Sequence, residues 1–201
     1  MKKISFSFGV LLFLAFFGTS SSASNISGPE KTVSEFQNTL TQVLREKDYE
    51  SKFALLLPSV SKLFAIETIA RISLGRSTWG ELKENEKQVF RTLTENLIAS
   101  TYAARFKRFE DQRFKINDSR SLTKNRHVVK TQLFSGEVVV SLEYYLQNKD
   151  STLQIYDIVA NGVSDLSMKR SAYQKTLAES GFSGLVDDIN EEIKKNLEKS
   201  F

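Results

Sequence analysis

The hydrophobic period of this chain changes twice, and these changes constrain its fold more than any other sequence feature. Up to Phe109, apolar residues recur every three or four positions, as in helices that bury one face. From Gln112 to Val159 they recur mostly every second position, as in strands. After Ser164 the helical spacing returns. The order helices, strands, helices predicts an α+β fold in which helices cover one face of a sheet.

The first part of the chain predicts several amphipathic helices. One begins at Pro29, where proline suits a first helical position. A short apolar run is expected to end at Pro58. The next helix is expected from Val60 to Ile72, and Gly75 is expected to stop it. Trp79 is expected in a loop. The longest apolar stripe then predicts one helix from Leu82 to Phe109.

The middle of the chain predicts a four-stranded antiparallel meander. Strands are expected from Gln112, over 126–134, over 138–146 and from Leu153, with short polar turns between them. Strict alternation in the fourth strand would put Ile155 on the face opposite Ile158.

The end of the chain predicts a sharp turn followed by two helices. Gly162 allows the turn, and Ser164 is a suitable N-cap for a helix over 165–179. Gly181 is expected to end that helix, and a second is expected over 184–199.

The N-terminus has the pattern of an export signal. Lys2 and Lys3 precede an apolar run over 4–17, and small residues follow as far as an expected cleavage after Ala23. A membrane anchor is the alternative, but the apolar run is shorter than the roughly 20 residues that a spanning helix needs. We therefore expect an exported protein with one domain over 24–201.

Composition narrows the class further. The chain has no cysteine, so its stability in an oxidising compartment would depend on its core rather than on disulfides. Without Lys2 and Lys3, the 28 basic residues become 26 against 24 acidic ones, a net charge of +2. The basic pI of the whole chain is thus no argument for a nucleic-acid partner.

Few residues suggest chemistry. His127 is the single histidine, and without a second histidine or a cysteine it cannot form a zinc site; we expect a solvent-facing strand residue. Asp157 interrupts an apolar strand face. It is either a general base in a cavity or a structural carboxylate bound to loop amides or to Arg170, and the lack of catalytic partners favours the structural role.

Aromatic and basic residues alternate between Tyr102 and Lys115. Export argues against nucleic-acid binding by this segment. A solvated helix face, a contact to lipid phosphate and docking on an acidic partner all stay open.

Several short motifs have the spacing of a known family. They are Leu74-Gly75-Arg76, Trp79, Phe90, Tyr102, Tyr156-Asp157-Ile158, Gly162-Val163-Ser164, Arg170, Tyr173 and Gly181-Phe182-Ser183-Gly184-Leu185. On these residues, the sequence between positions 58 and 190 resembles the MlaC, or toluene-tolerance, family of periplasmic lipid carriers. Segments 102–106 and 169–173 also resemble its hopanoid-associated branch, HpnM.

The resemblance implies a carrier without catalytic activity, metal or cofactor, whose cargo is phospholipid or another lipid such as a hopanoid. It also implies two partners: an inner-membrane ABC transporter with an MCE-domain protein, and an outer-membrane lipoprotein complex. A small enzyme that uses Asp157 and a ligand-free adaptor are the rivals from other classes.

A lipid carrier needs an apolar cavity between helices and sheet. The inward-facing residues that we expect to line it are Phe64, Trp79, Phe90, Leu93, Leu97, Val140, Leu142, Tyr144, Ile155 and Val163. The residues that we expect to fix the turn and the last two helices are Tyr156, Asp157, Gly162, Ser164, Arg170 and Gly181.

Overall fold

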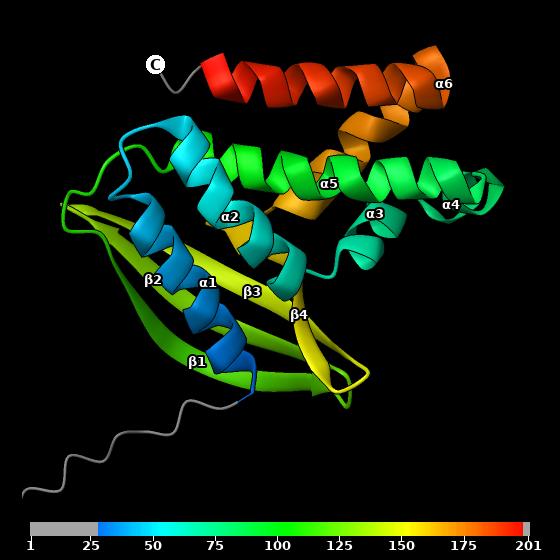
Figure 1. Cartoon of the computed structure of the whole chain (residues 1–201). Helices are drawn as coiled ribbons and strands as arrows, with labels where there is room; N and C mark the ends of the chain where they lie inside the picture. The colour runs from blue at the N-terminus through cyan, green and yellow to red at the C-terminus, as the bar shows by residue number, and fades with distance from the viewer. Residues whose placement is uncertain (1–27, 199–201) are drawn as a thin grey trace, which may run out of the picture.

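The computed structural model describes residues 28–198, so the expected signal peptide, residues 1–23, lies outside the described residues. The helices are α1 (Pro29–Val43), α2 (Tyr49–Leu63), α3 (Ile66–Leu74), α4 (Arg76–Glu81), α5 (Glu84–Arg105) and α6 (Asp165–Glu198). The strands are β1 (Arg113–Thr123), β2 (Arg126–Ser135), β3 (Val138–Lys149), β4 (Thr152–Ala160) and β5 (Val163–Ser164). The predicted α+β fold is confirmed (Figure 1). Within the described residues, no helix is both long and apolar enough to span a bilayer.

The sheet is an antiparallel meander in the order β1-β2-β3-β4-β5, with five strands instead of the predicted four. The additional strand has only two residues and pairs with the end of β4. Asn161 and Gly162 form the tight turn between them, with φ of 48° and 82°. Positive φ at both positions is typical of a two-residue hairpin turn, for which Asn-Gly is a favoured sequence.

A bulge in β4 changes the faces that alternation predicted. Ile155 pairs with Leu146 and Ile158 with Tyr144, and the pairing register shifts between these two pairs. Both isoleucines are therefore buried on the helix-covered face, because the bulge adds one residue between them. The expectation that they lie on opposite faces was wrong.

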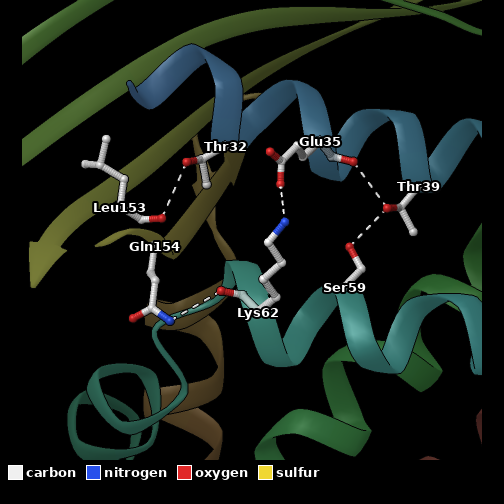
Figure 2. Close-up of polar contacts among 7 residues, drawn as sticks. All are labelled: Thr32, Glu35, Thr39, Ser59, Lys62, Leu153 and Gln154. Carbon is white, nitrogen blue, oxygen red and sulfur yellow. Dashed lines mark hydrogen bonds and ion pairs between the residues drawn. The ribbon is translucent and has the colours of Figure 1, made fainter. Parts of the chain in front are cut away.

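Helices α1 and α2 lie across one face of the sheet (Figure 1). Polar contacts hold them together at the β4 edge (Figure 2). Lys62 of α2 forms an ion pair with Glu35 of α1 at 2.8 Å. The Thr32 hydroxyl donates to the Leu153 carbonyl at 3.4 Å, and the Gln154 amide donates to the Lys62 carbonyl at 3.4 Å. These bonds fix the two helices against the strand that also carries the bulge.

The α2–α3 region differs from the prediction in two ways. Pro58 lies inside α2, which continues because Leu56, Val60 and Leu63 bury one face on both sides of it. The expected continuous helix over 60–72 is instead broken at Phe64, which is extended and forms a parallel bridge with Ile155. The Ala65 amide donates to the Ile155 carbonyl at 2.8 Å, so this break occupies part of the β4 edge.

The following helices also differ in their bounds. Trp79 lies in the short helix α4 and not in a loop, and α5 ends at Arg105, before Phe109. At the start of α5, the Glu86 carboxylate accepts a hydrogen bond from the Lys83 amide at 2.7 Å. This bond compensates for a poor N-cap residue.

Two groups of buried side chains form the interior. The first core joins α1, α2, the C-terminal half of α5 and the sheet, and it includes Phe36, Leu56, Tyr144, Leu146 and Ile155. The second core joins α3, α5 and α6: Ala70, Leu74, Phe90, Leu93, Leu97, Tyr173, Leu185 and Ile189. Gly181, with φ 66° and ψ −168°, divides α6 into two helical halves, which Figure 1 shows running in different directions from the point where they meet.

Candidate functional site

A cavity of about 110 Å³ lies where the two cores meet. Its walls come from α3, α5, both halves of α6, strand β4 and the break after α2. The lining residues are Phe64, Ile69, Ser73, Thr94, Leu97, Ile98, Thr101, Tyr102, Arg105, Tyr156, Asp157, Ile158, Asp165, Leu166, Lys169, Tyr173 and Glu192. Phe64 and Ile158 belong to the first core, whereas Leu97 and Tyr173 belong to the second. The cavity is thus a gap in the seam between the two cores, both of which include residues of α5.

The cavity wall is mainly apolar although it contains hydroxyl side chains. The Ser73 hydroxyl donates to the Ala70 carbonyl at 3.0 Å, and the Thr94 hydroxyl donates to the Phe90 carbonyl at 2.8 Å. These hydroxyls are therefore satisfied by their own helices. Such small residues leave space between bulky neighbours without exposing unpaired polar atoms.

One side of the cavity carries charge. We call Arg105, Asp157, Asp165, Lys169 and Glu192 the mouth residues. Lys169 binds both carboxylate oxygens of Glu192, at 2.6 and 2.7 Å, and so joins the two halves of α6. Asp165 interacts electrostatically with Arg105, Asp157 and Lys169. The arrangement gives an apolar interior with a polar opening.

Asp157 and Ser164 together cap the N-terminus of α6. The Ser164 hydroxyl donates to the Asp157 carboxylate at 2.7 Å and accepts from the Ser167 amide at 3.0 Å. The other Asp157 oxygen accepts from the Leu166 amide at 3.2 Å. These bonds satisfy two of the free amides at the start of the helix and place a negative charge beside its positive end.

Burial shifts the pKa of several groups around the cavity. Desolvation raises the pKa of Tyr102 well above its usual value, and it also raises the pKa of Tyr173. Asp165 keeps an exposed surface but lies among enough protein atoms that desolvation raises its carboxyl pKa, with Arg105 acting in the opposite direction. Farther along the sheet, burial raises the pKa of Tyr144 to about 12. The Tyr102 and Tyr173 phenols at the cavity are thus neutral at physiological pH.

The ten residues predicted to line a cavity do not lie together. Phe64 and Leu97 line it. Phe90, Leu93, Tyr144 and Ile155 are buried in the two cores, and Leu142 and Trp79 are partly buried against them. Val140 is also partly buried.

Val163 is the clearest departure, since it is 51% exposed and lies outside the cavity. It belongs to the two-residue edge strand, in which the Ser164 side chain is the one that turns toward Asp157. The side chains of successive strand residues point to opposite sides, so Val163 points away from that bond.

The turn residues occupy defined positions. Tyr156 and Asp157 line the cavity, while Gly162 and Gly181 both have the positive φ that favours glycine. Arg170 is exposed on α6, and the Asp157 carboxylate is held by Ser164 and the Leu166 amide instead of by Arg170.

Sequence reasoning missed most of the α5 wall. Thr94, Ile98, Thr101 and Arg105 recur at steps of three or four and share one face of that helix. Small polar residues that interrupt an apolar helix face were the available signal. Asp165, Lys169 and Glu192 were also missed as lining residues.

A second hollow, of about 350 Å³, has a mostly polar lining that includes Glu67, Gln88, Glu95, Gln147 and Gln154. This polar lining does not suit an apolar ligand. Within residues 28–198, no group of three or more His, Cys, Asp or Glu side chains could hold a metal ion. His127 contacts Ser121 through Nδ1 at 3.2 Å, on neighbouring strands away from the cavity.

Comparison with known proteins identifies a family and a solved structure of similar fold. The family model described as MlaC protein matches residues 30–191. A solved structure of a phospholipid-binding protein from Ralstonia solanacearum, in complex with a phospholipid, is similar with a TM-score of 0.73 and 18% sequence identity. The similarity covers 83% of this chain and 97% of that one, and at this identity it supports the fold. No curated protein matches the sequence.

Proposed function

The chain belongs to the MlaC family, and from this premise we propose that it is a periplasmic lipid carrier that binds phospholipid and has no catalytic activity. The observation that carries the proposal is the mainly apolar cavity in the seam between two cores, with a charged mouth on one side. The phospholipid complex of the Ralstonia protein, which shares this fold, supports it.

The proposed mechanism is transfer of acyl chains from water into the protein. Each methylene that leaves water contributes about 0.8 kcal/mol, so long chains favour the bound state strongly. A pocket for a lipid requires roughly 300 Å³ or more, which exceeds the 110 Å³ of the cavity described here. The seam must therefore widen when lipid enters.

The division of the interior suggests which parts separate. The sheet, α1, α2 and the C-terminal half of α5 hold one core, and α3, the N-terminal half of α5 and α6 hold the other. We propose that lipid enters between them, so that Phe64 and Leu97 contact acyl chains first. Phe90, Leu93, Tyr144 and Ile155 would become wall residues only as the cores move apart.

We further propose that the carrier shuttles lipid between the outer and inner membranes as the soluble component of an ABC-transport system. Its proposed partners are an MCE-domain protein of the inner-membrane transporter and an outer-membrane lipoprotein complex. The export pattern of residues 1–23 supports this location.

Lipid mass spectrometry of the natively purified protein tests the proposal. Phospholipid should be present in organic extracts of the wild type. Thr101→Trp, which fills the cavity from α5, should remove most of it, while Thr92→Trp makes the same change at an exposed position of the same helix and should not. Thr101→Trp also removes the 3.4 Å hydrogen bond that the Thr101 hydroxyl accepts from the Asn196 amide. That amide keeps its 3.1 Å bond to the Ser100 hydroxyl.

The other outcomes separate the rivals. Extracted hopanoid in place of phospholipid would assign the cargo to the hopanoid type. Absence of any lipid, together with normal folding, would contradict the carrier and favour an adaptor. Turnover of an ester substrate that is lost in Asp157→Ala would favour an enzyme, although both Asp157 oxygens accept hydrogen bonds at the start of α6.

A further inference from the structure

The mouth of the cavity has an unequal charge balance. Of its five charged residues, Arg105 and Lys169 are basic, and Asp157, Asp165 and Glu192 are acidic. With all five ionised, the mouth has a net charge of −1. This sign is opposite to that of the whole chain, which is +4.

The two basic residues of the mouth differ in whether they already form an ion pair. Lys169 is committed to Glu192 by two short hydrogen bonds. Arg105 is exposed and has no ion-pair partner within 4 Å among residues 28–198, so its guanidinium is available to an anionic group of a ligand. Asp165 lies at the start of α6 and interacts electrostatically with Arg105.

We propose that this mouth selects zwitterionic phospholipids with an ammonium group over anionic phospholipids with the same acyl chains. The inference rests on the proposed lipid-carrier function and deepens it. The lipid phosphate lies toward Arg105, and the ammonium lies toward the Asp165 carboxylate, because both oxygens of Glu192 are held by Lys169. An anionic headgroup brings a phosphate for Arg105 but no cation for Asp165, and it adds negative charge to a mouth that is already negative.

A competition experiment tests the selection. The full chain, stripped of lipid, is mixed with equal amounts of phosphatidylethanolamine and phosphatidylglycerol that have identical acyl chains, and the bound lipids are counted by native mass spectrometry at low salt. We expect about a two- to fivefold excess of bound phosphatidylethanolamine, the effect of one charge in a partly exposed site. The excess should shrink at high salt, because exposed charges are screened.

Matched double variants separate the mouth from the overall charge. Asp165→Asn/Glu192→Gln changes the mouth from −1 to +1 and should abolish or reverse the preference. Glu179→Gln/Asp187→Asn removes the same two charges from exposed positions of α6 outside the cavity lining and should keep it. If the mouth variant folds poorly, Arg105→Gln provides the second test: it should weaken binding of both lipids and increase the relative exclusion of the anionic one.

The results distinguish the inference from the function on which it rests. Equal binding of the two lipids by the wild type, or an unchanged preference in the folded mouth variant, would overturn the selection while leaving the carrier intact. No binding of either lipid by the wild type would overturn the carrier itself.

Discussion

The Asp157 carboxylate accepts the Ser164 hydroxyl at 2.7 Å across the Asn161-Gly162 turn, and its other oxygen accepts the Leu166 amide. One side chain of β4 thereby holds the first turn of α6, and α6 in turn supplies part of the cavity wall. The geometry of the cavity therefore depends on a capping contact that lies beside it.

The first prediction concerns this contact. Asp157→Asn keeps one acceptor but loses the negative charge at the helix N-terminus, so it should lower the free energy of unfolding by about 1 kcal/mol. Asp157→Ala removes both acceptors and should cost about 2 kcal/mol. Urea denaturation gives the two values. The total amount of bound lipid should stay near that of the wild type in Asp157→Asn; complete loss of lipid with unchanged stability would contradict the structural role.

The capping contact shows what the sequence could predict. Gly162 and Ser164 carry local signals for a turn and an N-cap, and the change of hydrophobic period predicts the order of helices and strands. These features depend on residues that are close along the chain. The bulge that buries both Ile155 and Ile158 depends on pairing with β3, and it has no signal within β4.

Tertiary packing also explains the other departures. Proline usually marks a helix end, yet the burial of Leu56 and Val60 on one face carries α2 through Pro58. The sequence of α5 does not show which of its apolar side chains pack against a neighbour and which face a cavity, because a packed core and a cavity wall are made of the same residue types. Only the positions of the facing elements distinguish Leu97, at the cavity, from Phe90, in the core.

A second prediction concerns the break in α6. Gly181 has φ 66° and ψ −168°, a conformation that is essentially restricted to glycine, although a Cβ there would meet no atom within 4 Å. Gly181→Ala should therefore lower the free energy of unfolding by about 1–3 kcal/mol through backbone strain alone.

The control is Gly80→Ala in α4, where a Cβ also has open space and φ is not positive; it should leave stability unchanged or raise it by about 0.5–1 kcal/mol. Thermal and urea unfolding compare them, and equal effects of the two changes would contradict the strain argument.

A third prediction uses the buried phenol of Tyr144. Its pKa is raised to about 12 by burial, against about 10 in an unfolded chain. The folded state thus favours the neutral phenol. The resulting stability is fully present below pH 10 and is lost as the pH rises from 10 to 12. Between pH 9 and pH 11, ionisation of Tyr144 should lower the free energy of unfolding of the wild type by an amount on the order of 1 kcal/mol. Tyr144→Phe should not show this decrease.

Tyr144→Phe should also reduce the stability of the protein at neutral pH. The Gln37 amide donates to the Tyr144 oxygen at 3.5 Å and to Thr131 at 3.2 Å, so Tyr144→Phe should lower stability at pH 7 by about 1 kcal/mol or less. Urea unfolding at several pH values, with tyrosinate absorbance as a second readout, measures both effects. Tyr102 and Tyr173 also have raised pKa values, so part of the alkaline loss should persist. An alkaline stability curve identical to that of the wild type would exclude the assignment to Tyr144.

The last prediction concerns how the cavity accommodates lipid. Because 110 Å³ is too small for acyl chains, lipid entry must move α5 and the first half of α6 relative to β4. Hydrogen exchange of lipid-free and lipid-loaded protein should therefore differ over 94–105, 155–158 and 165–173. The paired strands β1 and β2 contribute no lining residue and should exchange alike in both forms, which makes them an internal control. Thr101→Trp should show no lipid-dependent difference in any segment. If the largest change fell in β1 and β2, lipid would bind elsewhere, and the seam between the two cores would not be the site of entry.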